Sequence, residues 1–278
     1  MKRSALFRLL VFVFVALFVC AATGCEGGDA CRKSIEDTPG ATGGGSAGGG
    51  GGTTPPSGGG SVTPALAGTS GGSGGQTGLG GTTVNAGGAT YSLIVPSSPP
   101  NPAPFLVVFS GTEGRSTMTS NLLQLRQMIS GLSSYIIAVL DGRDSSASDG
   151  AAALDDVRSK YNIDNDKTCL LSESAGTPEG QQLGFDLRQS YFAAYWVNDI
   201  AGPPSGPSKT ASELGFAPHG NAGPGGAFAA ANAIVDAMRA AGYRLPADAP
   251  YSGAGCGSHG DQNQFMAALK FFPGKSRQ

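Results

Sequence analysis

The sequence predicts an α/β fold: a single compact domain with a mostly parallel sheet and helices on both of its faces. Three observations predict it. From residue 89 onward, short apolar runs alternate with stretches whose apolar residues recur at helical spacing. Several of these runs are continuous, as in strands that are buried on both faces. The roughly 190 residues involved are enough for one sizeable core and too few for two ordinary domains.

The strands are predicted from the apolar runs. Residues 89–95 alternate between apolar and polar and stop at Pro96, whereas 104–109 and 135–140 are continuously apolar. Further strands are expected at 168–171, 192–197 and 216–218.

The helices are predicted where apolar residues recur every three or four positions. The clearest is 228–242, which is amphipathic and closed by Gly242. The others are expected at 117–132, 149–161, 175–189 and 262–272. Because helices follow most of the strands, we expect consecutive strands to run parallel.

The N-terminus looks like a targeting signal rather than part of the fold. Basic residues precede the apolar stretch 9–22, which is 14 residues long and short for a bilayer-spanning helix of about 20. The stretch ends in Ala-Thr-Gly-Cys (22–25), which resembles the lipobox of bacterial lipoproteins. That resemblance implies a signal peptide over 1–24, a lipid on Cys25 and an extracytoplasmic protein tethered to the cell envelope. An ordinary secretory signal and an uncleaved anchor are the alternatives.

Residues 25–88 are predicted to be a disordered Gly/Ser/Thr-rich tether, followed by the domain over 89–278. Of the chain's 46 glycines, 21 lie between residues 41 and 90, where there is no charged side chain. Such a composition cannot bury enough apolar surface to offset the entropy lost on ordering. As a flexible coil the tether would span about 45 Å r.m.s..

Cysteine usage and charge narrow the function classes. After cleavage, Cys31, Cys169 and Cys256 would remain in an oxidising compartment, where one intramolecular pair can form that the sequence does not identify. The net charge is −2, without a run of either sign, so nucleic-acid binding is not expected. Two histidines far apart and no Cys-x-x-Cys spacing give no reason to expect a metal or another cofactor.

Ser174 is the candidate nucleophile. Residues 170–176 read Leu-Leu-Ser-Glu-Ser-Ala-Gly, an apolar strand end followed by small residues and a helical pattern. This is the context of a nucleophile elbow, a turn so tight that neighbouring residues must be small. Literal G-x-S-x-G matches at Ser46, Ser70 and Ser73 lie in the tether and lack that context. The alternative role for Ser174 is a helix cap.

His259 is the candidate general base. It lies in the glycine-rich loop 255–260, just before the last expected helix, and in sheet hydrolases the histidine comes last in the chain order. A neutral imidazole within reach of Ser174 would take its proton during attack and return it to the leaving group. The alternative is an exposed loop histidine. His219, at a strand end, is expected to be structural.

Backbone N–H groups of Gly111, Thr112 and Ala175 are the candidate oxyanion-hole donors. The run 104–109 ends in Ser-Gly-Thr-Glu-Gly, in the position of the loop that supplies one donor. The residue after the nucleophile supplies the other, and such donors stabilise the charge that develops in the transition state.

Taken together, residues 89 to about 273 resemble a compact α/β-hydrolase, similar in kind to secreted esterases such as polyhydroxybutyrate depolymerases and feruloyl esterases. The matching segments are 105–111, 161–164, 172–176, 192–197, 219–224 and 257–260. The resemblance implies transfer of an acyl group to water through a serine–histidine–acid triad. Because residues 200–212 are few and rich in Gly and Pro, little chain is available for a lid, and the open site that this predicts suits an ester or an acylated polymer.

Three positions depart from the family's pattern. Ser110 stands where the oxyanion motif has His, and Ser172 stands where the elbow has Gly. Gly223 takes the place of the usual triad acid in His-Gly-x-Ala-Asp-Pro.

Asp199, at the end of the preceding strand, is therefore the expected replacement acid. Asp248 lies in a loop of unknown position and Asp261 is almost adjacent to His259, so both are poorer candidates. Two hypotheses remain open. The chain is a membrane-tethered serine esterase, or it is a catalytically inactive hydrolase scaffold that serves as a surface binding lipoprotein.

Overall fold

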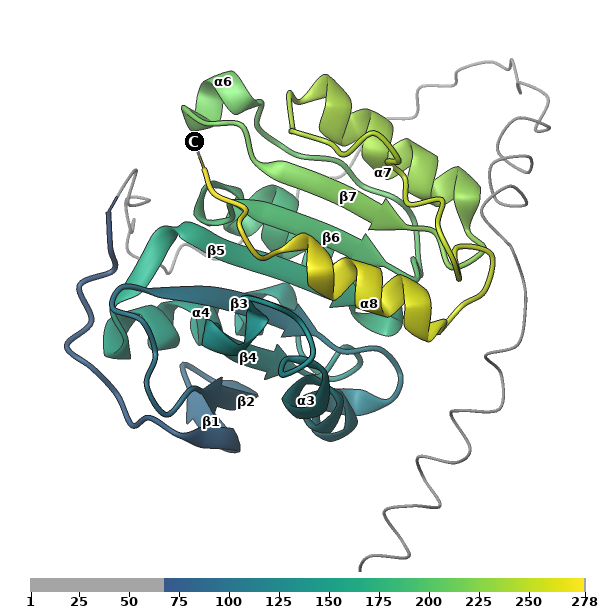
Figure 1. Cartoon of the computed structure of the whole chain (residues 1–278). Coiled ribbons are helices and arrows are strands. Elements are labelled where there is room, and N and C mark those ends of the chain that lie inside the picture. The colour runs from purple at the N-terminus through teal and green to yellow at the C-terminus, as the bar shows by residue number, and fades with distance from the viewer. Residues whose placement is uncertain (1–67, 278) are drawn as a thin grey trace, which may run out of the picture.

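The computed structural model describes residues 68–277. Seven strands form one sheet in the order β1-β2-β4-β3-β5-β6-β7 (Figure 1). β1 pairs antiparallel with β2 and β2 antiparallel with β4, whereas β3 to β7 run parallel. The strands are β1 (Leu79–Ala86), β2 (Ala89–Val95), β3 (Ala103–Phe109), β4 (Ile136–Leu140), β5 (Ile163–Glu173), β6 (Ala194–Asn198) and β7 (His219–Gly223).

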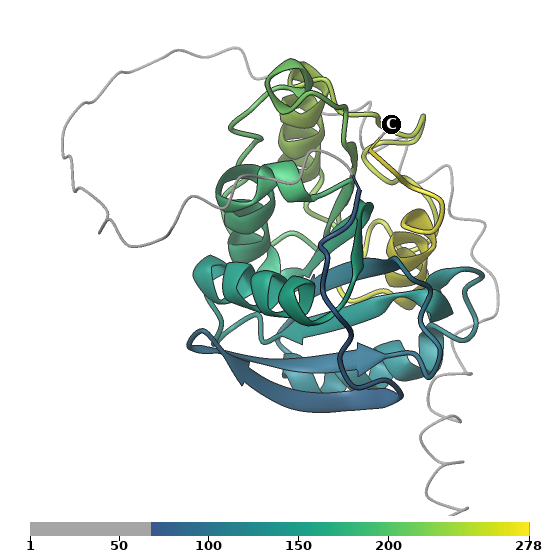
Figure 2. The same cartoon turned by 90° about the vertical axis from the view of Figure 1, so that its left-hand side faces the viewer.

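Helices cover both faces of the sheet, as the edge-on view in Figure 2 shows. On one face, α3 (Gly114–Leu125) and α8 (Gln262–Phe271) pack on the apolar side chains of β3 to β6. On the other face lie α4 (Ala147–Lys160), α5 (Thr177–Gln182) and α7 (Phe228–Ala240). A short α6 (Ala211–Leu214) precedes β7. The α/β fold predicted from the alternation of elements is confirmed.

The central strands form because their residues are apolar on both faces. Every residue of β3 and β4 is buried, as their continuous apolar runs predicted. Of the helices, α4 begins at a capping box, in which the Ser146 hydroxyl and the Asp149 carboxylate satisfy each other's backbone N–H groups.

The helix expected over 175–189 is divided into several short pieces. A 3₁₀ turn (Ser174–Gly176) leads into α5, which continues as a π-helical turn (Leu183–Leu187) and ends in a second 3₁₀ turn (Gln189–Tyr191). Likewise, α3 ends at Leu125 rather than at residue 132, and Met128 is 73% exposed.

The ordered chain begins before residue 89, where the tether was expected to end. β1 lies within that stretch, and residues 68–78 run beside the start of β5. The Ser70 N–H donates to the Ile163 carbonyl at 2.9 Å and the Tyr161 hydroxyl donates to the Gln76 carbonyl at 2.7 Å. The end of the glycine-rich segment is therefore attached to the domain. The predicted signal peptide, the candidate lipidation site Cys25 and the rest of the predicted tether lie outside the described residues.

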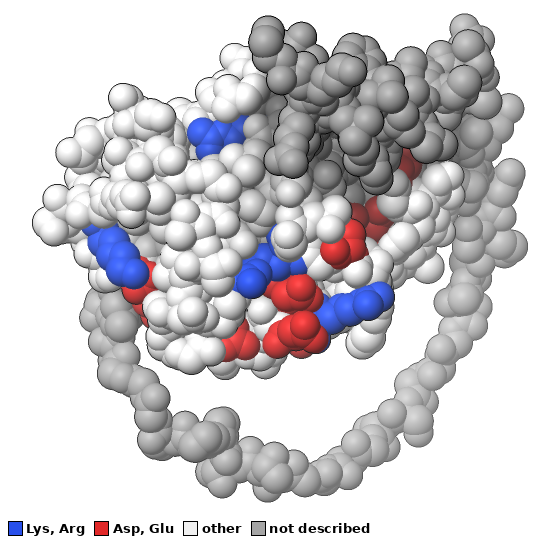
Figure 3. Space-filling model, turned by 90° about the horizontal axis from the view of Figure 1, so that it is seen from below, with Lys and Arg blue, Asp and Glu red and all other residues white. Residues whose placement is uncertain are grey.

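The last strand is shifted relative to its prediction. It occupies His219–Gly223 instead of 216–218, because the small residues of this segment fit between β6 and α7. On the face seen from below, Lys and Arg side chains lie beside Asp and Glu side chains (Figure 3). Within residues 68–277, no helix is both long and apolar enough to cross a membrane.

Candidate active site

The register of β5 and β6 brings Ser174 and Asp199 side by side. Glu173 pairs with Asn198 at the ends of these parallel strands, so the next residue of each strand emerges at the same place. We call this end of the sheet the carboxyl edge, and the opposite end the amino edge. Sites in parallel α/β sheets lie at the carboxyl edge.

Both residues have strained backbones. Ser174 has φ of 47° and Asp199 has φ of 49°, and they are the two non-glycine residues with positive φ in the described part of the chain. Such conformations are unfavourable for side-chain-bearing residues and persist where the surroundings enforce them, often at functional sites. At Ser174, the strain lifts the side chain out of the end of β5, as an elbow requires.

The structure brings the candidate nucleophile and base together. The Ser174 Oγ and the His259 Nε2 are 2.8 Å apart, which is hydrogen-bond distance. Ser174 is buried, whereas His259 is exposed on the loop between Tyr251 and α8. A ring nitrogen at this distance can accept the hydroxyl proton.

Asp199 is tied to the loop that carries His259. One carboxylate oxygen accepts the Gly260 N–H at 2.5 Å, and the other accepts the Gln264 side-chain amide at 2.5 Å. Among residues 68–277, no hydrogen bond joins Asp199 to the imidazole itself. The carboxylate therefore holds Gly260, the residue that follows His259 in the chain.

A second carboxyl group adjoins Asp199. Glu173, directly before the candidate nucleophile, is buried and accepts a hydrogen bond from the Asn198 side-chain amide at 2.8 Å. Burial, followed by the negative charge and hydrogen bonding of Asp199, raises the pKa of Glu173. The raised pKa favours the neutral, protonated form of Glu173 beside Asp199.

The expected oxyanion donors differ in their availability. Ala175 lies in the first turn of a 3₁₀ helix, where N–H groups have no acceptor within the helix. The Gly111 N–H, by contrast, already donates to the Glu113 carboxylate at 2.9 Å. A side chain added at Gly111 would collide with the same carboxylate and would come within 3.1 Å of the Ser174 Cβ. An internal anion therefore occupies one predicted donor beside the nucleophile, while Thr112 is exposed on the same loop.

Two of the three departures from the family's pattern are compensated by packing. The Ser172 hydroxyl forms a hydrogen bond with the Tyr195 hydroxyl at 2.9 Å. A Cβ added at Gly180 would lie only 2.3 Å from the Ser172 Cβ, so a glycine at position 180 leaves room for the Ser172 side chain. Gly180 in α5 therefore provides the space that a glycine at position 172 would otherwise provide in the elbow. The Ser110 hydroxyl accepts the Gly142 N–H at 3.1 Å and thereby joins the ends of β3 and β4.

The third departure is Gly223, and the structure leaves no room for an acidic side chain at this position. A Cβ at this position would lie 2.2 Å from the Asn198 Oδ1 and 2.9 Å from the Gln264 Cδ. These two side chains fill the usual place of the acid. Gln264 donates to Asp199, one strand away, so the space is used to hold the candidate replacement.

Sequence reasoning missed Glu113, Glu173 and Gln264. Glu173 was visible in the elbow segment, but its burial depends on the register between β5 and β6. The other two reach the site through loop and helix geometry that no motif encodes. Of the poorer acid candidates, Asp261 caps α8 by accepting the Asn263 N–H at 2.7 Å, and Asp248 is exposed.

Two hollows of about 260 and 200 Å³ lie at the amino edge, away from Ser174. The first is lined by residues at the start of β3, before β4 and after α8, together with Lys167. The second lies between residues 72–77 and Tyr161. Within the described range, no three His, Cys, Asp or Glu side chains are grouped as metal ligands would be.

No family model matches the sequence, and no curated protein matches it significantly. Solved structures of similar fold include a thermostable esterase, with 14% identity, a TM-score of 0.49 and coverage of 71% of this chain and 63% of that one. A dienelactone-hydrolase-like promiscuous phosphotriesterase from metagenomic libraries has 14% identity, a TM-score of 0.46 and coverage of 70% and 98%. A hormone-sensitive lipase from a metagenome library has 12% identity, a TM-score of 0.42 and coverage of 64% and 77%. The chain thus spans under two thirds of the length of the thermostable esterase.

The fold assignment rests on this chain's own features. The sheet has one antiparallel strand, β2, inserted between β1 and the parallel strands, and Ser174 stands at a strained strand–turn–helix junction. A histidine from the last loop reaches that serine, in the chain order that the fold requires. The protein therefore has an α/β-hydrolase fold.

Proposed function

We propose that the protein is a serine hydrolase that cleaves carboxylic esters, with Ser174 as nucleophile, His259 as general base and Asp199 as the acid. The observation that carries the proposal is the 2.8 Å contact between the Ser174 Oγ and the His259 Nε2, made by a serine on strained backbone. A serine that only capped a helix would need neither the strain nor the histidine.

In the proposed reaction, the Ser174 Oγ attacks the ester carbonyl carbon while its proton passes to the His259 Nε2. The carbonyl oxygen becomes an oxyanion, which the Ala175 N–H and the loop around Gly111 stabilise. His259 then donates its proton to the departing alcohol oxygen, leaving an acyl group on Ser174. Water, deprotonated by His259, attacks the acyl carbon, and the released Ser174 regains the proton.

Asp199 would act by charge and by position. A carboxylate beside the imidazole stabilises the imidazolium that forms during attack. Its contact with the Gly260 N–H also fixes the loop on which His259 stands. The neighbouring Glu173, whose pKa is raised by burial, is favoured in its neutral form and then adds no second negative charge there.

We further propose that a lipid on Cys25 holds the protein to the cell envelope, on the extracytoplasmic side. The lipobox-like residues 22–25 support this. Esters and acylated polymers are the proposed substrate class, because the candidate histidine is exposed.

One observation favours the alternative of an inactive surface binding scaffold. Glu113 occupies the Gly111 N–H, which an active site would offer to its substrate. The altered motif positions Ser172 and Gly223 support this alternative less than Glu113 does, because neighbouring residues are shaped to fit the residue found at each of them.

Hydrolysis of a panel of acyl esters by the full-length protein in detergent tests the proposal. We expect Ser174→Ala to lower kcat by at least about a thousandfold. Cys169→Ser, at a buried free thiol remote from the site, is the control and should stay active. A fluorophosphonate probe should label the wild type and not the Ser174 variant. Equal inactivity of both proteins, without labelling, would establish the scaffold instead.

A further inference from the structure

Cys256 lies three residues before His259, on the same loop, and is disulfide-bonded. It is fully buried, and its carbonyl accepts the Gly226 N–H at 2.9 Å. The covalent bond therefore joins another part of the chain to the base of the loop that carries the candidate general base.

The partner of Cys256 lies outside residues 68–277. The other cysteine in that range, Cys169, is a buried free thiol, and the cysteines before residue 68 are Cys20, Cys25 and Cys31. This inference rests on the proposed function, in which Cys20 leaves with the signal peptide and the Cys25 sulfur carries the lipid. Cys31 is the thiol that remains.

The length of the intervening chain permits this pairing. Residue 68 lies at the amino edge, where the Asn165 N–H donates to the Gly68 carbonyl, and Cys256 lies at the carboxyl edge. β5 runs from one edge to the other, and its 11 residues correspond to about 36 Å. A glycine-rich coil of the 37 steps from Cys31 to Gly68 has an r.m.s. span of about 33 Å. The distance to be covered matches the reach of the chain.

We propose that Cys31 and Cys256 form the disulfide, so that the face around Ser174 and His259 lies at the membrane that holds the Cys25 lipid and takes its ester from that surface. Five residues lie between Cys25 and Cys31, so the six steps from one to the other span at most about 20 Å. A tether running uninterrupted to residue 88 would instead hold the domain about 45 Å r.m.s. from the anchor.

The partner surface is thus a lipid bilayer, and the substrate is an ester of an amphiphile in it. The exposed His259 beside the less accessible Ser174 suits a substrate that is presented at the opening rather than enclosed. Confinement to the same surface raises the effective concentration of such an ester at the site without a new binding contact.

Peptide mapping of the mature full-length protein, alkylated without reduction, tests the bond. We expect one linked peptide pair that contains Cys31 and Cys256, with alkylation of Cys169 after denaturation. An alkylated Cys256, or its linkage to Cys25, overturns the proposal. The mass of the N-terminal peptide reports separately whether Cys25 is lipidated.

The membrane placement is tested by two substrates, with the protein reconstituted in phosphatidylcholine vesicles. One is p-nitrophenyl acetate in solution and the other is p-nitrophenyl palmitate in the same vesicles. Cys31→Ser should lower the ratio of the vesicle rate to the soluble rate by at least about fivefold. Ser34→Ala, a nearby change that keeps the cysteine, should alter neither rate.

The outcomes are distinct. An unchanged ratio of vesicle rate to soluble rate in Cys31→Ser overturns the membrane placement. Absence of soluble-ester hydrolysis in all three proteins contradicts the proposed esterase, while the peptide map still decides the disulfide.

Discussion

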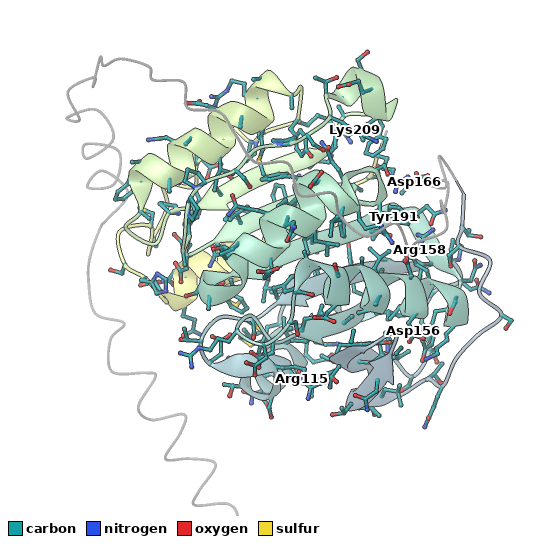
Figure 4. All side chains as sticks on the ribbon, turned by 180° about the vertical axis from the view of Figure 1, so that it is seen from behind. Arg115, Asp156, Arg158, Asp166, Tyr191 and Lys209 are labelled. Atoms are coloured by element: carbon teal, nitrogen blue, oxygen red, sulfur yellow. The ribbon has the colours of Figure 1, made fainter. Side chains whose placement is uncertain are left out.

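The carboxyl and amino edges of the sheet both gather polar side chains, and they do so in opposite ways. At the amino edge, Arg158 and Arg188 lie over the ring of Tyr191, at 4.8 and 5.6 Å, and Arg277 donates to the Tyr191 carbonyl at 2.7 Å. Figure 4 shows Arg158, Tyr191 and Asp166 close together. These are cations matched with a ring face, a carbonyl and neighbouring carboxylates.

At the carboxyl edge, by contrast, the two buried carboxyl groups of Glu173 and Asp199 adjoin each other, and Ser174 and Asp199 have positive φ. Both features oppose folding. The cation–ring and carbonyl contacts of the amino edge favour it, although the buried Tyr191 hydroxyl in that cluster has no hydrogen-bond partner among the described residues. The comparison teaches which polar cluster to interpret as functional. The one that departs from the rules of stable folding is the better candidate.

The largest expected effect comes from neutralising the acid of the carboxyl edge. Asp199→Asn should lower kcat for ester hydrolysis by about a thousandfold, because the imidazolium loses its counter-charge. Asp166→Asn, the same change at the amino edge, should alter kcat by less than about twofold. Steady-state kinetics of both variants measure the difference. An unaffected rate in Asp199→Asn would remove this residue from the triad.

Next in size is a pH effect on stability from Glu173. Its raised pKa means that the native state holds a proton that the unfolded chain has released, once the pH exceeds the ordinary pKa of glutamate. The free energy of unfolding should therefore fall with rising pH, by up to about 1.4 kcal/mol per unit, until the pH passes the folded-state pKa. Glu173→Gln, which stays neutral, should lack this fall. Urea unfolding between about pH 5 and 9 checks it, and parallel curves for the two proteins would contradict the assignment of the proton.

Substitutions at the amino edge should lower the free energy of unfolding and leave the rate of ester hydrolysis unchanged. Arg277→Ala truncates a residue that is 5% exposed and should lower the free energy of unfolding by about 1–3 kcal/mol. Arg239→Ala breaks an exposed pair with Asp236 and should cost under about 1 kcal/mol. Chemical denaturation measures both. If Arg277→Ala slowed ester hydrolysis while remaining folded, the separation of the two edges would be wrong.

The smallest expected effect sharpens the account of the oxyanion donors. Glu113→Ala should free the Gly111 N–H and raise kcat/KM by about three- to tenfold, corresponding to one hydrogen bond of about 1 kcal/mol. Glu213→Ala, at an exposed helix cap remote from the site, should leave kcat/KM unchanged. A fall in kcat/KM for Glu113→Ala would instead assign this carboxylate a part in the reaction.

The sequence predicted the central strands and the serine because both depend on local patterns. Continuous apolar runs define β3 and β4, and the small residues on either side of Ser174 in the sequence identify it. β1 was missed because it is glycine-rich and half exposed, and its order depends on pairing with β2. The glycine segment before it is held by Tyr161, about 90 residues further along the chain.

The candidate site could be predicted only as far as residue type and chain order reach. Ser174 and His259 were named, and the structure brings them together. Glu173 and Asp199 adjoin each other because the register of β5 and β6 places Glu173 opposite Asn198, and no local sequence pattern specifies that register. The contact of Glu113 with Gly111 depends on the path of a single loop.

The positive φ values at Ser174 and Asp199 also limit which sequences evolution can explore at these positions. A β-branched residue is severely strained there, so threonine, chemically the nearest relative of serine, is excluded as a replacement nucleophile. Cysteine has no branch at Cβ and is open to selection. At position 199, asparagine tolerates the left-handed region, so the acid can be lost by a substitution that the backbone accepts without strain. A lineage could therefore lose catalysis at this site while keeping its shape intact.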